Sequence, residues 1–193
     1  MIGLTGYAGV GKTAAGEILK SLGAEVVNAD RLGHAALADA AVQAQLRDFF
    51  GDGIFTGGAA AREVDRKTLG GLVFADSAKL AFLESVSHPW IAARVREAAA
   101  RAGEKPLVVD AALLKVLALD AEFSRILLVT APWETRLARV RGRGWDADEL
   151  RRRDAALAGK TYSPGEPKVV PLANDGGLDA LREKIVNMHL FAS

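Results

Sequence analysis

The chain has 193 residues, of which 50% are hydrophobic and 25% charged, and its formal net charge is +1. This length and hydrophobic content predict one globular domain with a sizeable core. The balanced charge gives no support for a broad nucleic-acid-binding surface. The absence of cysteine excludes disulfides, thiolate catalysis and cysteine metal sites, and three separated histidines, His34, His88 and His189, have no metal-ligand spacing.

The first predicted element is a short buried strand over residues 2–5, and a helix with hydrophobic residues at helical spacing begins after residue 13. Between them, residues 6–13 read GYAGVGKT and match GxxxxGK[ST], the phosphate-binding loop. Glycines let the backbone N–H groups point inward, and the helix N-terminus adds positive potential. This order of strand, loop and helix favours a nucleotide site over a glycine-rich turn without a ligand. It also makes a signal peptide unexpected at this end.

Each residue of the loop has an expected role. Lys12 can reach the β- and γ-phosphates of a nucleoside triphosphate, and the Thr13 hydroxyl can ligate Mg²⁺. We expect the phosphates of a nucleoside triphosphate to be held by Gly9, Val10, Gly11, Lys12, Thr13 and Ala14.

A second short strand contains Val26 and Val27 and ends near residues 28–30. Because parallel strands end at one edge of a sheet, Asp30 can return to the phosphate site and accept a proton from an attacking hydroxyl. Asp30 can equally be the N-cap of a helix beginning at Arg31. The residues themselves leave both interpretations open.

A helical region follows over residues 31–50, then a glycine-rich turn over 51–58 and further helix over 65–103. The residue before a proline avoids the α conformation, so we expect a break at His88–Pro89. His88 at this corner either contacts a ligand or is a hydrogen-bonded histidine of the corner.

A third strand over residues 107–110 ends on Asp110, and a fourth covers 126–130. An acid at the end of a hydrophobic strand is typical of a residue that holds Mg²⁺ or its water shell. A cap at the following turn is the alternative for Asp110. The stretch 107–119 is interrupted by charges and is too short to span a bilayer, so we expect no membrane association and a cytoplasmic protein.

Pro132 opens a helix that carries Arg136, Arg139 and Arg143, and the basic run continues through residues 151–153 to Lys160. Arginine forks suit phosphates, so these residues predict a mobile lid that closes on ligands. A solvated basic helix face is the alternative interpretation.

A fifth strand is predicted over residues 169–173, and Pro171 favours an edge position for it. A turn follows, and the last helix has Leu178, Leu181, Ile185 and Met188 on one face. Alternating strands and helices predict an α/β fold with a parallel sheet covered on both faces and ligands at the carboxyl ends of its strands.

With these residues in hand, the chain resembles the dephospho-coenzyme A kinase family from Ile2 to the final helix. Single motifs are weak, but their order and spacing are specific. They are IGLTG at 2–6, VVNADR at 26–31, LVF at 72–74, HP at 88–89, VDAALL at 109–114, ETRLAR at 134–139 and ANDG at 173–176.

The resemblance implies a single P-loop kinase domain over 1–193, with a three-layer fold, a helical acceptor-binding insert over about 31–103 and a lid over about 143–167. It implies ATP- and Mg²⁺-dependent phosphorylation of the ribose 3′-hydroxyl of dephospho-CoA, the last step of coenzyme A synthesis, by a monomer or weak homo-oligomer. The roles that it implies are Asp30 as catalytic base beside Lys12, Arg139 and Arg143 as nucleotide contacts, and Asp30, Arg31, His88 and Lys115 as acceptor contacts.

The chain departs from the family pattern on the acceptor and lid sides. Asn28 replaces the first aspartate of a pair, Ala112 replaces a proline, and Lys115–Val116 replace an aromatic–glutamate pair. The usual Ala-Gln of the lid is not evident between Arg153 and Lys160. A nucleoside monophosphate kinase and a non-catalytic nucleotide-binding module therefore remain alternatives. A GTP-dependent switch has little support because the guanine-reading NKxD motif is absent.

Overall fold

The computed structural model describes residues 1–57 and 63–191. The chain divides into two compact units. One consists of Met1–Ala29 together with Val95–Ser193, and the other is Asp30–Arg94. No helix in the described ranges combines the length and the hydrophobicity needed to cross a membrane.

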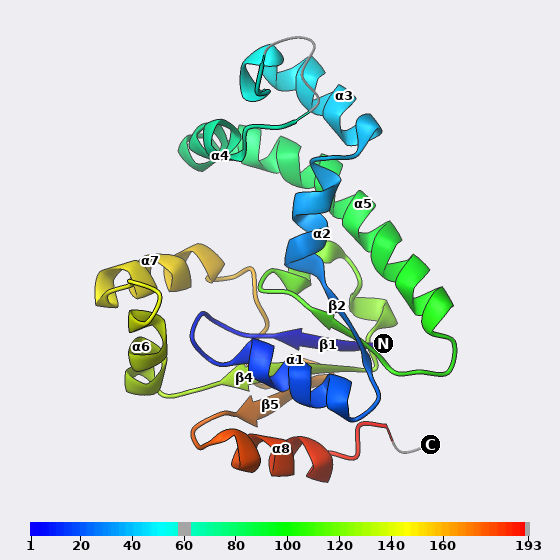
Figure 1. Ribbon diagram of the computed structural model, residues 1–193, viewed down its shortest axis with the longest axis vertical. Helices are drawn as coiled ribbons and strands as arrows, with labels where there is room; N and C mark the ends of the chain where they lie inside the picture. The colour runs from blue at the N-terminus through cyan, green and yellow to red at the C-terminus, as the bar shows by residue number, and fades with distance from the viewer. Residues whose placement is uncertain (58–62, 192–193) are drawn as a thin grey trace. The chain divides into compact units, whose positions relative to one another are not determined.

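The first unit is built on a parallel sheet of five strands in the order β2-β3-β1-β4-β5 (Figure 1). The strands are β1 Ile2–Thr5, β2 Glu25–Asn28, β3 Leu107–Asp110, β4 Arg125–Thr130 and β5 Val169–Ala173. All five predicted strands are confirmed to within two residues. Pro171 lies in the edge strand β5, where its missing N–H removes no bond to a further strand.

Helices α1 (Lys12–Ser21) and α8 (Leu178–Asn187) pack on one face of this sheet. Leu4 and Leu127 of the sheet are fully buried in one core with side chains of the two helices. Burying each such leucine contributes roughly 2 kcal/mol. On the opposite face a 3-10 helix, η3 (Leu114–Leu117), packs so closely that a side chain on Gly3 would collide with that of Leu114. The unit is completed by α6 (Trp133–Arg141) and α7 (Ala147–Leu157).

Strand register brings polar residues together at the carboxyl edge. Asp110 is paired with Leu4 of β1 on one side and with Asn28 of β2 on the other. Because β1 runs from Leu4 and Thr5 into the phosphate loop, Asp110 ends beside the strand that carries the loop, and Asn28 ends one strand farther away. The predicted meeting of the loop and Asp110 at one sheet edge is confirmed.

The second unit contains α2 (Ala29–Ala36, whose first residue precedes the unit boundary), α3 (Ala40–Phe50), η1 (Asp52–Ile54), α4 (Arg66–Ala75) and most of α5 (Ser77–Ala102). Its helices bury a separate core that includes Leu46, Ile54 and Leu69. The predicted turn over 51–58 contains η1, and its last residue, Gly58, lies outside the described residues.

Two predicted helix boundaries in this unit are wrong. The region 31–50 is two helices, because the Asp39 carboxylate accepts bonds from two backbone N–H groups and begins α3. The break in 65–103 falls at Asp76, which receives the N–H groups of Ala78 and Lys79, and not at His88–Pro89.

Helix α5 continues through Pro89. A proline inside a helix costs about 3 kcal/mol. Val86, Ile91 and Ala92, which flank it, are all buried. Their packing holds the backbone in the helical conformation that the local rule disfavours.

Candidate active site

A cavity of about 510 Å³ opens above the phosphate loop. The loop and the start of α1 form one side of it, and Arg139, Arg143 and residues 176–178 form the other. The structure therefore brings Gly9, Gly11, Lys12, Thr13 and Ala14 together with both predicted nucleotide-contacting arginines. Val10 is not among the residues that line the cavity, and its side chain is buried in the core.

The loop backbone requires glycine at two positions that touch its neighbours. Gly9 and Gly11 have φ values of +78° and +95°, a region that other residues seldom adopt. A Cβ at Gly9 would lie 2.9 Å from the backbone oxygen of Arg136, and one at Gly11 would collide with the side chain of Asn174. The loop is therefore packed directly against α6 and the end of β5.

Three side chains hold the carbonyl groups of the loop. Arg136 Nε donates to the Ala8 oxygen at 2.8 Å, and Asn174 Nδ2 donates to the Val10 oxygen at 2.7 Å. Arg139 Nη1 lies 3.4 Å and 3.2 Å from the oxygens of Gly9 and Val10. A trans peptide is planar and its C=O and N–H point in opposite directions, so fixing the carbonyls fixes the direction of the next N–H groups.

The two arginines predicted to contact the nucleotide differ in their surroundings. Arg139 lines the cavity, but its guanidinium also donates to the loop and to Asn174. Arg143 is exposed and lies beyond α6, which ends at Arg141. The prediction that one helix carries both is therefore wrong, because the chain turns at Gly142, yet both side chains line the same cavity.

Lys12 and Asp110 lie together beneath the cavity. Lys12 Nζ is 3.8 Å from Asp110 Oδ1, and Asn28 Nδ2 donates to Asp110 Oδ2 at 3.5 Å. Asp110 is buried and ends β3, and the next helical residues begin at Leu114. The helix-cap alternative for Asp110 is therefore wrong.

These residues fit a magnesium ion that is shared with a bound nucleotide. Mg²⁺ prefers one or two carboxylates, phosphate oxygens and several waters to an all-protein cage. Thr13 supplies a hydroxyl at the start of α1, and Asp110 supplies the carboxylate. The described residues contain no group of three or more His, Cys, Asp or Glu side chains that could hold a metal by themselves, so phosphate would have to complete the site.

Asp30, Arg31 and His88 belong to the second unit and do not line this cavity. Asp30 is exposed in the first turn of α2, which begins at Ala29 directly after β2. The N-cap interpretation for a helix beginning at Arg31 is therefore wrong. Arg31 is exposed, and His88 is half-buried within α5 instead of at a helix break.

Lys115, the other predicted acceptor contact, lies in η3. Its Nζ pairs with Glu166 Oε2 at 2.8 Å and lies 5.5 Å from the ring centroid of Tyr162. Burial and a hydrogen bond to Asp120 raise the pKa of Tyr162, so its hydroxyl keeps its proton and donates to that carboxylate. These contacts tie the segment after α7 to η3.

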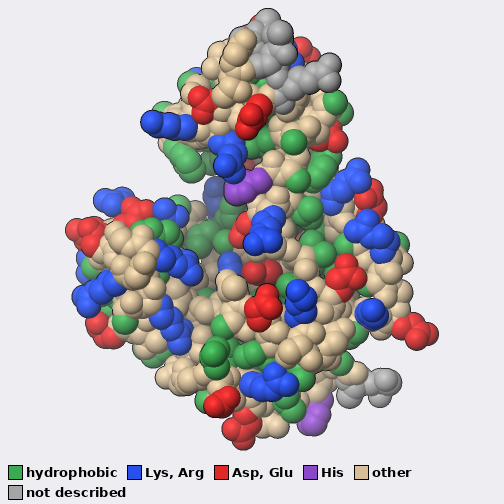
Figure 2. All heavy atoms as spheres, in the orientation of Figure 1, with side chains coloured by type: hydrophobic (Ala, Val, Ile, Leu, Met, Phe, Trp, Pro, Cys, Tyr) green, Lys and Arg blue, Asp and Glu red, His purple; other side chains and the backbone are tan. Residues whose placement is uncertain are grey.

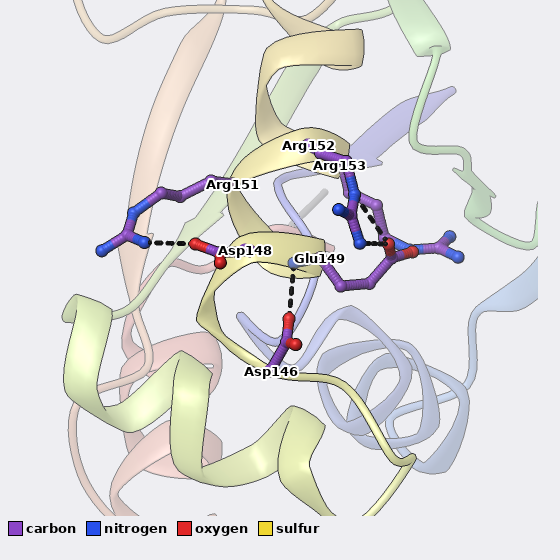
Figure 3. A network of polar contacts seen from close by, with 6 residues as sticks. All are labelled: Asp146, Asp148, Glu149, Arg151, Arg152 and Arg153. Atoms are coloured by element: carbon purple, nitrogen blue, oxygen red, sulfur yellow. Dashed lines mark hydrogen bonds and ion pairs between the residues drawn. The ribbon is translucent and has the colours of Figure 1, made fainter.

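The basic segment is not purely basic, because several of its arginines form ion pairs with acidic residues of the same helix. Figure 3 shows three adjacent arginines of α7 with partners on the same helix. Arg151 pairs with Asp148 at 2.8 Å, and Arg152 and Arg153 both pair with Glu149 at 2.7 Å. Arg152 and Arg153 hold the pKa of Glu149 below its ordinary value. Basic and acidic side chains are interspersed over α6 and α7 in Figure 2, so this surface is mixed in charge.

Sequence reasoning missed two residues of the site and misassigned a third. It read Asn174 as part of a turn, although its position directly after a strand, at the carboxyl edge, was a usable signal. It gave Arg136 no role apart from the general basic run. Leu178 was expected in the core face of the last helix, but it is 67% exposed and lines the cavity.

Comparison with known proteins identifies the family that this chain resembles. The sequence model of the dephospho-CoA kinase family matches residues 1–162. A dephospho-CoA kinase from Chlorobaculum tepidum is 31% identical, over 98% of this chain and 93% of that protein. The solved structure of TT1252 from Thermus thermophilus has a TM-score of 0.79 and 29% identity, covering 98% of this chain and 95% of that one. A dephospho-CoA kinase from Campylobacter jejuni, 21% identical, shares the fold with a TM-score of 0.63, covering 97% and 94% of the two chains.

Proposed function

Because the chain belongs to the dephospho-CoA kinase family, we propose that the cavity above its phosphate loop is where its phosphoryl transfer takes place. The enzyme phosphorylates dephospho-CoA with ATP in coenzyme A biosynthesis. The observation that carries the site assignment is the cavity lined by Lys12, Thr13 and Arg139. Residue roles and the use of Mg²⁺ are the parts proposed here.

On the nucleotide side, the chain supplies positioning and positive charge. Phosphoryl transfer needs little covalent help from a protein, so most of the rate enhancement comes from alignment and charge stabilisation. Lys12 neutralises charge that develops on the transferred group, and Arg139 and Arg143 add positive potential along the cavity. Thr13, and Asp110 directly or through water, would hold Mg²⁺, which would neutralise negative charge on the nucleotide phosphates.

On the acceptor side, Asp30 accepts the proton of the ribose 3′-hydroxyl as that oxygen attacks the γ-phosphorus. Asp30 lies in the first turn of α2, two residues after β2 ends at Asn28, and an exposed carboxylate there is suited to orient a hydroxyl in this way. Arg31, His88 and Lys115 are the proposed contacts for the remainder of dephospho-CoA. The helical unit Asp30–Arg94 supplies all of these residues except Lys115.

We expect Mg²⁺-dependent release of ADP from ATP to be stimulated by dephospho-CoA and not by AMP, CMP or pantetheine phosphate. A coupled ADP-release assay with each acceptor measures this, and chromatography against coenzyme A identifies the position of the new phosphate. Equal stimulation by AMP or CMP would instead indicate a nucleoside monophosphate kinase. Nucleotide binding without turnover on any acceptor would indicate a non-catalytic module.

We also expect the segment 143–167 to close on its ligands. The pairs within α7 do not tie that helix to the rest of the unit, so closure of the segment must carry along or release the pairs Arg136–Asp154 and Lys115–Glu166. Hydrogen exchange of this segment should slow when a non-hydrolysable ATP analogue and dephospho-CoA are added together. Unchanged hydrogen exchange with both ligands bound at saturation would show that the segment does not close, and would favour the interpretation of a solvated helix face.

A further inference from the structure

Arg136 joins three parts of the first unit through one guanidinium. Its side chain is only 10% exposed. Nε donates to the Ala8 oxygen of the phosphate loop at 2.8 Å, while Nη2 pairs with Asp154 Oδ1 of α7 at 2.5 Å. The rings of Tyr7 and Trp133 lie within 5.4 Å and 5.7 Å of the guanidinium carbon. The side chain is thus held between the loop, its own helix α6 and α7.

The bond to Ala8 acts on the phosphate-binding surface. The peptide that follows Ala8 has its C=O directed at Arg136, so the N–H of Gly9 in the same planar unit points the other way. Gly9 lines the nucleotide cavity, and phosphate loops bind their ligand through such N–H groups. The guanidinium of Arg136 therefore sets the direction of one phosphate-binding donor.

Asp154 sets the position of that guanidinium. Charges in a largely buried pair are costly to leave without their partner, whereas exposed pairs contribute little. Asp154 and Arg136 have side chains only 24% and 10% exposed, against 76% and 64% for Asp148 and Arg151 on the outer surface of α7. The pair of Asp148 also stays within α7, while that of Asp154 reaches a different helix.

We propose that Arg136 and Asp154 are a positioning pair that couples the seating of α7 to the orientation of the phosphate loop. When α7 is in place, Asp154 holds Arg136, Arg136 holds the Ala8 carbonyl, and the Gly9 N–H faces the phosphates. Neither side chain needs to touch the nucleotide. The inference rests on the proposed role of this cavity as the ATP site, and it makes ATP affinity depend on a carboxylate of the lid helix.

The test is Asp154→Asn, with Asp148→Asn as a matched control on the same helix. Asparagine keeps the shape and a hydrogen bond but removes the charge. We expect the Kd and KM for ATP to rise about tenfold, as for loss of a charge-assisted bond at a largely buried site, while the KM for dephospho-CoA changes less than twofold. Asp148→Asn should stay within twofold of the parent in each. Asp154→Glu, which retains the carboxylate, should recover most of the lost ATP affinity.

A merely structural role would lower the melting temperature and impair both substrates together, and that result would overturn the proposal. Unchanged ATP affinity in folded Asp154→Asn would overturn it as well. Calorimetry with ATP alone tests the coupling through Arg136 and Asp154 independently of the proposed acceptor. Weakened ATP binding in Asp154→Asn supports the coupling even if dephospho-CoA is not the acceptor. Normal turnover on dephospho-CoA with unchanged ATP binding removes the coupling and leaves the function standing.

Discussion

We expect Lys12→Ala to abolish measurable turnover and to weaken ATP binding. The Lys12 ammonium is the positive side chain that the phosphate loop itself supplies, and it lies on the floor of the nucleotide cavity, 3.8 Å from Asp110 Oδ1. Its removal takes away charge stabilisation of the transferred phosphoryl group and leaves the Asp110 carboxylate closer to uncompensated phosphate charge. We expect the rate to fall by about 10³-fold or more, since a single well-placed donor is commonly worth 10²–10³.

Single-turnover kinetics and calorimetry with ATP measure the two effects separately. Lys20→Ala is the matched control, because Lys20 is an exposed lysine in the last turn of the same helix α1. It should leave both rate and affinity near those of the parent. If Lys12→Ala bound ATP and transferred phosphate as the parent does, the assignment of this loop to the nucleotide phosphates would be wrong.

The phosphate loop was predictable because its signal is local. A strand, glycines that permit positive φ, a lysine and a helix follow one another within residues 2–22, and the structure places them as expected. The same holds for Asp110, whose position at the end of a hydrophobic strand fixes it at the carboxyl edge of the sheet. Strand order could not be read in this way, because it depends on which strands pack together.

The side-chain hydrogen bonds to the loop carbonyl groups were not predictable from local patterns. Arg136 and Asn174 contact loop residues more than 120 positions away in the chain. Nothing in an arginine-rich helix distinguishes a side chain that binds phosphate from one that holds the backbone beneath it. The acidic partners of the α7 arginines lie three or four positions away on the same helix, so this local signal was present in the sequence but was not used.

The helix break shows where a local rule gives way to packing. In the sequence, His88–Pro89 is the stronger signal for a helix break, whereas Asp76 is only a residue type that is common at N-caps. The structure breaks the chain at Asp76, where capping satisfies two N–H groups, and continues through Pro89, where flanking side chains are buried. His88 therefore enters the acceptor proposal as a residue of a continuous helix.

The most decisive result for the chemistry is expected from Asp30→Asn. If Asp30 accepts the proton of the attacking hydroxyl, the substitution removes proton acceptance while keeping the size and much of the hydrogen bonding. The rate should fall by about 10²–10⁴-fold, the usual range for a general base. ATP affinity should change little, because the phosphates are held by the loop, Lys12 and Arg139.

The structure sharpens the alternative that this substitution must exclude. Asp30 is an exposed acid in the first turn of α2, where a negative charge interacts favourably with the helix dipole. A residue with that role alone would lose at most about 1 kcal/mol of stability on conversion to asparagine, or a few degrees of melting temperature, and the rate would survive. Asp48→Asn, at another exposed aspartate of the helical unit, controls for loss of charge.

Single-turnover kinetics beside thermal melting decide between these roles. A large fall in rate with a small shift in melting temperature identifies Asp30 as the base. A variant that melts as expected and still transfers phosphate near the parent rate would remove Asp30 from the mechanism. Asp110, which lies beside Lys12 and Asn28, would then be the next candidate, to be tested by the effect of its substitution on Mg²⁺ dependence.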